Sequence, residues 1–131
     1  MLAQDRAGIY EQAVEELRAG LKRSHWMWFV FPQIAGLGRS ETAKRYAIAS
    51  SAEAAAYLAH PVLGPRLVRC ARILTELPQR TAVQIFGPVD AQKLHSSMTL
   101  FAHAGPGQPV FRQVLDLYFD GDDDTQTTRR L

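Results

Sequence analysis

Apolar side chains recur along most of this chain at the spacing of one helix face. Residues 5–19 are the first example, and Gly20 is expected to end that helix, because glycine readily takes the left-handed C-cap conformation. The spacing is the i, i+4, i+5 and i+8 pattern of an amphipathic helix. Its apolar positions are Ile9, Ala13, Val14 and Leu17.

Three further helices are predicted in the middle of the chain. Ser40 can cap a helix that runs through Ile48, and an alanine-rich helix runs from Ser51 to near His60. Pro61 suits the first position of the third helix, where its missing N–H costs nothing. That helix has an apolar face and a basic face: Leu63, Leu67, Cys70, Ala71 and Leu74 on one, Arg66, Arg69 and Arg72 on the other.

Three more helices are predicted in the last third. Thr81 can cap a short helix that ends at Gly87, and Asp90 can cap a longer one that runs to Ala104. After a Gly-Pro-Gly turn, residues 109–119 again carry apolar side chains on one side.

The overall pattern predicts an all-α protein. No segment shows the period-two alternation of a strand, and no repeat of fixed length recurs. A chain of 131 residues has room for one core. We therefore expect residues 1–131 to form a compact single domain, an array of about six or seven short helices. The polar residues 122–131 are expected to be a frayed tail.

Composition indicates a globular protein without a membrane span. The chain is 47% hydrophobic and 21% charged, as is typical of globular proteins. This composition excludes a chain that is intrinsically disordered over its whole length. Its longest apolar run, residues 26–31, ends at Pro32 and is far shorter than the roughly 20 residues a spanning helix needs. No secretory signal is visible, and the single Cys70 suits a reducing compartment, so we expect a cytoplasmic location.

Charge is distributed unevenly along the chain. Between Arg18 and Arg72 there are nine basic and two acidic residues, whereas aspartates crowd the C-terminal end. This asymmetry permits an anionic ligand on the first half, with nucleic acid not expected as a partner. Solvated helix faces are the alternative explanation.

Aromatic side chains are densest in residues 24–33, SHWMWFVFPQ. There are too many rings to bury along one helical face, so some should line a cleft or an interface, where they could stack on a planar ligand. His25 and Gln33 would supply hydrogen-bonding groups. Alternatively, Trp26, Phe29 and Phe31 anchor the core, and His25 is an ordinary histidine near the surface.

Two further segments could contribute chemistry. The glycine-rich loop before Arg39 and Ser40 leads into a helix N-terminus, which favours an anion, although a plain loop and cap explain the segment without any ligand. Asp90, Lys93 and Ser97 share a helix face, where a desolvated lysine could activate a serine. Capping and backbone hydrogen bonds are the alternative for these three residues.

No metal or cofactor site is predicted. The four histidines and one cysteine lack the spacing of a zinc site. The Asp122-Asp123-Asp124 run lacks the glycine and terminal glutamate of a calcium loop.

Several segments together closely resemble one bacterial family, the domain-of-unknown-function 1810 family (DUF1810), some of whose members carry an automatic calpastatin label. Calpastatin is a disordered chain, whereas this composition is globular, so that label is set aside. The resemblance implies a compact all-α array and brings no established activity, substrate or cofactor. The segments that carry it are KRSHWMWFVFPQ (22–33), GLGRS (36–40), AKRYAI (43–48), HPVLGPRL (60–67), IFG (85–87), and Asp90 with KL (93–94) and SSMTLF (96–101).

The chain departs from this family at both ends. Family members usually run a leucine, an arginine and a phenylalanine before the equivalent of Ala3-Gln4, so we expect the first helix to be shortened. Related chains tend to be richer in leucine around Gln126 and Thr127.

Three functional hypotheses follow. The leading one is a module that binds a small anionic or nucleotide-like ligand, with the aromatic segment, the glycine-rich loop and the Asp90 helix face converging on one pocket. The second is a hydrolase or glycosidase acting on a nucleotide, with His25, Asp90 or Lys93 as acid or base. The third is a protein-interaction scaffold that uses the aromatic cluster. The candidate ligand-binding residues are Trp26, Trp28, Gln33, Arg39, Ser40, Lys44, Lys93 and Ser97.

Overall fold

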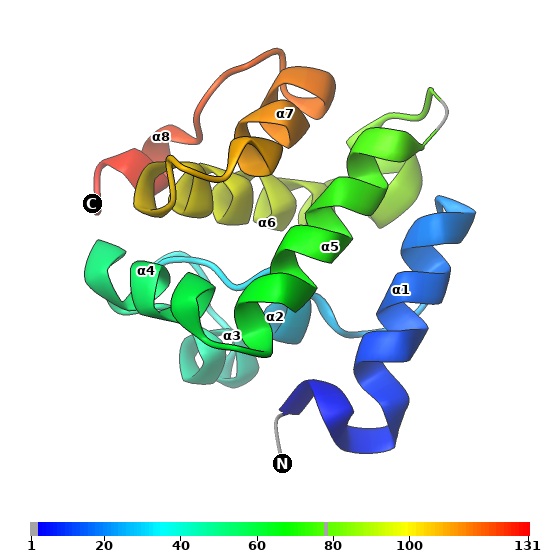
Figure 1. The fold of residues 1–131 in the computed structure, drawn as a ribbon, viewed down its shortest axis with the longest axis horizontal. Helices are drawn as coiled ribbons and strands as arrows, with labels where there is room; N and C mark the ends of the chain where they lie inside the picture. Colours follow the sequence, from blue (N-terminus) through cyan, green and yellow to red (C-terminus); the bar gives the residue numbers. More distant parts are fainter. Residues whose placement is uncertain (1–2, 78) are drawn as a thin grey trace.

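The computed structural model describes residues 3–77 and 79–131, and these residues are predominantly helical (Figure 1). The only extended pairing within them is an isolated bridge between Ile34 and Ile48. The all-α prediction is confirmed. The elements are the 3-10 helix η1 (Ala3–Gly8) and the α-helices α1 (Ile9–Ala19), α2 (Met27–Val30), α3 (Glu41–Tyr46), α4 (Ser51–Ala59), α5 (Leu63–Glu76), α6 (Ala82–Ala104), α7 (Pro109–Tyr118) and α8 (Thr125–Thr128).

Most of the predicted helix ends are capped as expected. Gly20 is left-handed at φ 70°, and its N–H donates to the carbonyls of the last turn of α1. The Ser40 hydroxyl accepts a hydrogen bond from the Ala43 N–H at 3.0 Å. Thr81 and Gln84 form a reciprocal capping box at the start of α6.

Helices α1, α3 and α5 each differ from the prediction at one boundary. Helix α1 begins at Ile9 rather than at residue 5, because the preceding residues form η1. Helix α3 ends at Tyr46 instead of continuing, because the N–H of Ile48 donates to the carbonyl of Gln33 at 2.8 Å. Helix α5 begins two residues after Pro61. The His60 ring nitrogen Nδ1 accepts from two consecutive backbone N–H groups there and so caps the new start.

The core lies between α5, α6 and α7, with α1 and α4 packed around them (Figure 1). Helices α4 and α5 approach so closely that a Cβ at Gly64 would overlap the carbonyl oxygen of Leu58, so this position requires glycine. Cys70 is fully buried, and burial raises the pKa of its thiol to about 12. Other large, fully buried side chains are Leu17, Leu67, Leu74, Leu94, Met98, Phe101 and Phe111.

The C-terminal residues 122–131 are ordered rather than frayed, which corrects the expectation drawn from their polarity. Asp124 and Thr127 are buried, and α8 packs against α6. The Asp124 carboxylate accepts hydrogen bonds from the hydroxyls of Ser96 at 2.8 Å and Thr127 at 2.6 Å. Its backbone N–H donates to the Thr99 hydroxyl at 2.9 Å. These hydrogen bonds compensate for the loss of solvent.

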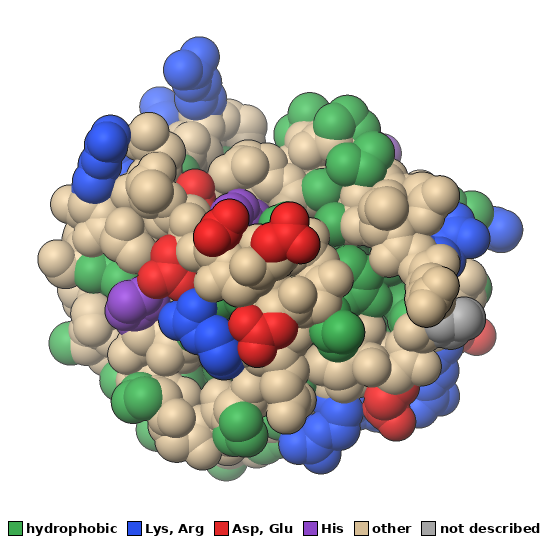
Figure 2. All heavy atoms as spheres, turned by 90° about the horizontal axis from the view of Figure 1, so that it is seen from above, with side chains coloured by type: hydrophobic (Ala, Val, Ile, Leu, Met, Phe, Trp, Pro, Cys, Tyr) green, Lys and Arg blue, Asp and Glu red, His purple; other side chains and the backbone are tan. Residues whose placement is uncertain are grey.

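Acidic side chains gather on the side of α7 and the segment that leads to α8. Figure 2 views the molecule from this side and shows acidic side chains near the middle and most basic ones toward the margins. Among the described residues no helix has both the length and the apolar character needed to cross a membrane. The cytoplasmic location stays a prediction.

Candidate functional site

Helix α6 is kinked where the site begins. Gly87 has φ 80° and ψ 165°, a backbone conformation that glycine adopts without strain. Pro88 follows, and its fixed φ suits the first position of the helical part that runs to Ala104. Asp90 therefore lies in the first turn of that part, and it is not the N-cap expected from the sequence.

The segment before α2 is held by one carboxylate of α1, that of Glu16. This side chain is 6% exposed. It accepts hydrogen bonds from the N–H groups of Arg23 and Ser24 at 2.7 and 2.9 Å and from the Trp26 indole at 2.9 Å. Burial alone would raise the pKa of Glu16, but hydrogen bonds from Ser24, Arg23 and Trp26 outweigh it and lower the pKa to about 2.

Lys22 lies at the start of this segment and is tied to α6. Its N–H donates to the carbonyl of Ile85 at 2.7 Å. Its ammonium nitrogen Nζ lies 2.8 Å from Oδ2 of Asp90, and only 8% of the Lys22 side chain is exposed. The main chain and side chain of Lys22 thus both join the loop to α6.

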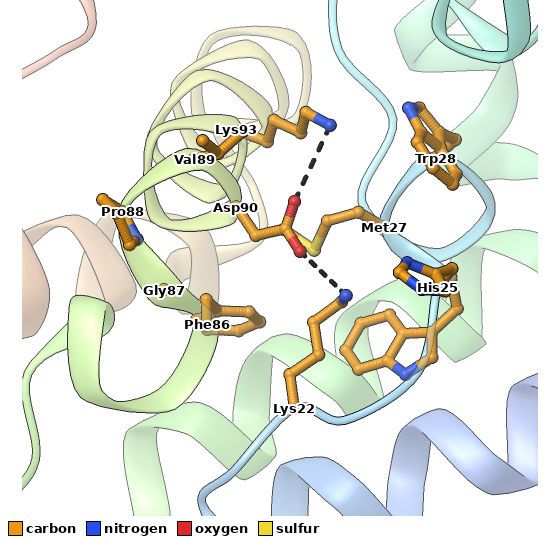
Figure 3. Close-up of a pocket in the computed structure, with 11 residues that line it drawn as sticks. Lys22, His25, Met27, Trp28, Phe86, Gly87, Pro88, Val89, Asp90 and Lys93 are labelled. Atoms are coloured by element: carbon orange, nitrogen blue, oxygen red, sulfur yellow. Dashed lines mark ion pairs between the residues drawn. The ribbon is translucent and has the colours of Figure 1, made fainter.

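A second lysine lies on the other side of the same carboxylate. Nζ of Lys93 is 3.7 Å from Oδ1 of Asp90, and each side chain is about one-fifth exposed, 21% and 20%. Figure 3 shows both ammonium groups directed toward Asp90. Two positive charges therefore share one negative charge, and the group carries an excess of one positive charge.

Indole rings lie beside both lysines. The Lys22 ammonium is 5.2 Å from the ring centroid of Trp26, and the Lys93 ammonium is 4.8 Å from that of Trp28. Both distances allow cation–π attraction. The Trp28 N–H is shielded from solvent and has no hydrogen-bond partner among the described residues.

These side chains surround a cleft of about 320 Å³, the size of small-molecule sites. In Figure 3 the side chains of Asp90 and Lys93 lie on the α6 side of the cleft, with His25 and Trp28 on the other. We call it the lysine cleft. Its lining residues are Lys22, His25, Trp26, Met27, Trp28, Phe86, Gly87, Pro88, Val89, Asp90 and Lys93.

The structure brings together some of the residues selected from the sequence. His25, Trp26, Trp28, Asp90 and Lys93 all line the lysine cleft. Trp26 is at the same time a core residue, 1% exposed, as the alternative interpretation of the aromatic segment expected.

Gln33 lines a narrow hollow of about 10 Å³ next to the lysine cleft. The hollow and the cleft share Met27, Trp28 and Lys93. Gln33 is therefore adjacent to the cleft without lining it.

The glycine-rich loop does not join the lysine cleft. Arg39, Ser40 and Lys44 are exposed, and none of the three lines it. The hydroxyl of Ser40 caps α3, and Lys44 makes a loose surface ion pair with Glu41 at 3.9 Å. Ala43 is the buried residue of α3, so the helix turns its basic side chains outward.

Ser97 lies in the core and not at the cleft. It is fully buried, and its hydroxyl has no partner among the described residues. Seven residues along a helix are about 10 Å, so Ser97 lies well beyond Asp90 along the packed part of α6.

Sequence reasoning missed Lys22 and Glu16 as parts of the site. Glu16 is on a helix that reads as an ordinary surface face, and Lys22 is one of many basic residues. One signal was present: a buried tryptophan needs an acceptor for its indole N–H, and Trp26 finds it in Glu16. The Gly87-Pro88 pair was a second signal, since it marks a break in a helix.

Among the described residues no group of three or more His, Cys, Asp or Glu side chains could hold a metal ion.

A family model described as protein of unknown function (DUF1810) matches residues 1–131. The chain belongs to the DUF1810 family. This confirms the resemblance seen in the sequence.

A solved structure is similar to this DUF1810 protein over nearly its whole length. It is the crystal structure of the conserved hypothetical protein Rv1873 from Mycobacterium tuberculosis, with 51% sequence identity and a TM-score of 0.93. The match covers 96% of this chain and 90% of that chain. No curated protein matches the chain. These relatives show the family and the fold, and their descriptions name no function.

Proposed function

We propose that this DUF1810 protein binds a small anionic, nucleotide-like ligand in the lysine cleft. The observation that carries the proposal is the pairing of two lysines with one carboxylate, Asp90, beside two indole rings. One positive charge is left over at a cleft that is large enough for a small molecule.

Lys93 is the lysine best suited to contact the ligand. At 3.7 Å its ammonium is beyond ideal hydrogen-bond distance from Asp90, whereas Lys22 is held at 2.8 Å. An incoming phosphate or carboxylate could attract Lys93 while Lys22 stays on Asp90. The first turn of the helix after Gly87 adds N–H groups that favour an anion.

Trp28 would recognise the remainder of the ligand. Its ring lines the lysine cleft, and an indole face can stack on a planar group. Its shielded N–H has no acceptor in the described residues, and an unpaired buried donor costs about 1–3 kcal/mol. A ligand acceptor at this position would satisfy that donor.

Calorimetric titration with adenosine monophosphate and with inorganic phosphate, at low ionic strength, tests the proposal. Lys93→Gln should weaken both ligands about tenfold or more, because a charge-assisted hydrogen bond is worth about 1.5–3 kcal/mol. Lys44→Gln is the matched control, since it removes the same charge outside the cleft. Equal affinities in Lys93→Gln and Lys44→Gln would contradict the proposal.

The other two hypotheses gain no specific observation. His25 is exposed and has no hydrogen-bond partner among the described residues, and Asp90 is engaged by both lysines. Trp26 and Phe31 contribute to the core instead of forming a flat interface patch. The hydrolase and scaffold hypotheses stay predictions.

A further inference from the structure

A second pocket, separate from the lysine cleft, lies among four aromatic rings. Its volume is about 210 Å³, and Trp28 is the one described residue that it shares with the lysine cleft. The other three rings are those of Phe29, Tyr46 and Tyr57, contributed by α2, α3 and α4. We call it the aromatic pocket.

The rings of the aromatic pocket are arranged edge to face. Phe29 meets Tyr46 at a centroid distance of 4.8 Å and an angle of 78°, and Trp28 at 6.3 Å and 77°. Such perpendicular pairs offer a ring face and a ring edge to a flat guest. The volume exceeds the roughly 150 Å³ of an apolar cavity that holds benzene.

One end of the aromatic pocket is polar, and its polar groups are fixed. Gln4 is 3% exposed. Its amide nitrogen donates to the carbonyl of Phe29 and to the hydroxyl of Tyr57, and its amide oxygen accepts from Arg66 at 3.3 Å. Arg66 is itself paired with Asp5 at 2.8 Å. Both amide hydrogens and the amide oxygen of Gln4 therefore have partners within the protein.

This network leaves the hydrogen of the Tyr57 hydroxyl free at the aromatic pocket. The Tyr57 hydroxyl accepts from Gln4 at 3.3 Å, so its own hydrogen is available, and it has no acceptor among the described residues. Burial raises the pKa of Tyr57 well above its ordinary value, so the phenol stays protonated. The ring of Tyr57 packs 5.5 Å from Phe101 of the core, which fixes the position of the hydroxyl.

We infer that the aromatic pocket is a second binding site, which takes an uncharged planar heterocycle with a hydrogen-bond acceptor on its edge. None of the described residues that line it carries a charge, unlike the lysine cleft. The rings hold the faces of the guest, and the Tyr57 hydroxyl donates to its acceptor. The inference does not depend on anion binding in the lysine cleft.

Two fused-ring probes of similar size test this inference by NMR titration of the full chain. Quinoline has a ring nitrogen that accepts a hydrogen bond, whereas the indole nitrogen only donates. Tyr57→Phe should weaken quinoline about three- to tenfold, the worth of one neutral hydrogen bond, and leave indole unchanged. Tyr118→Phe is the matched control, because it removes a hydroxyl that bonds to the carbonyl of Leu74 outside the aromatic pocket.

The position of binding is read from methyl signals. Leu63 lines the aromatic pocket, and Val89 lines the lysine cleft. Quinoline should shift the Leu63 methyls more than those of Val89, and Tyr46→Ala should weaken both probes about tenfold. Tyr46 forms a different wall of the aromatic pocket, so Tyr46→Ala still tests the inference if Tyr57→Phe does not fold. Absence of binding, shifts centred on Val89, or equal affinities in all variants would overturn the inference.

Discussion

The carboxylates of Asp90 and Asp124 are both largely withdrawn from solvent, but their partners differ in kind. Asp124 accepts from the neutral hydroxyls of Ser96 and Thr127 and is 5% exposed. Asp90 is one-fifth exposed and is paired with ammonium groups on two sides. A cleft opens beside Asp90, whereas Asp124 is buried where α8 packs against α6.

The comparison distinguishes a structural carboxylate from one at a site. At Asp124 the donors match the acceptor, so the cluster is complete and holds α8 against α6. At Asp90 the charge is not balanced within the protein, and an indole donor nearby is unpaired. A ligand in the cleft could supply both missing partners, a negative charge for the excess ammonium group and an acceptor for the indole N–H.

The largest expected effect is on stability, at Asp124. Asp124→Ala removes three hydrogen bonds to a buried charge, from Ser96, Thr127 and Gln92, and should lower the free energy of unfolding by about 3 kcal/mol. Anion affinity at the lysine cleft should not change. Urea unfolding and phosphate titration of the same variant check both statements. A stability within a few tenths of the parent would show that the C-terminal cluster is not structural.

An intermediate effect is expected at Glu16, which positions the loop that carries Lys22. Its pKa is lowered from 4.5 to about 2 in the folded protein. A lowered folded pKa contributes stability above the unfolded pKa, and this stability is lost as pH falls from about 4.5 through about 2. The lowered pKa corresponds to a contribution of about 3 kcal/mol.

Glu16→Gln tests this pH dependence. At pH 7 the variant should be less stable than the parent by about 2 kcal/mol, because the neutral amide oxygen of glutamine still accepts some of these hydrogen bonds. The difference should shrink as pH is lowered through 4 toward 2. Denaturant unfolding of both proteins across this pH range is the measurement. A difference that stays constant with pH would mean that the carboxylate charge is not what holds the loop.

The fold was largely predictable from local patterns, whereas the two carboxylate clusters were not. Helix caps such as Ser40 and Thr81 depend on neighbours three residues away, which the sequence displays. Asp124 bonds to Ser96 across 28 positions, and its run of aspartates looks solvated. Lys22 lines the lysine cleft and Lys44 does not, because the packing of α3 buries Ala43 and turns Lys44 outward. The sequence does not display that orientation.

The most direct test of the anion-binding account is phosphate affinity in Asp90→Asn. This change removes the negative charge that lies between Lys22 and Lys93 and keeps the shape of the side chain. The protein should lose some stability, because Lys22 is 8% exposed and loses its partner. The freed positive charge should tighten inorganic phosphate about three- to tenfold at low salt, with the gain reduced as salt is raised. Phosphate binding that is unchanged or weaker in a folded Asp90→Asn protein would contradict the account.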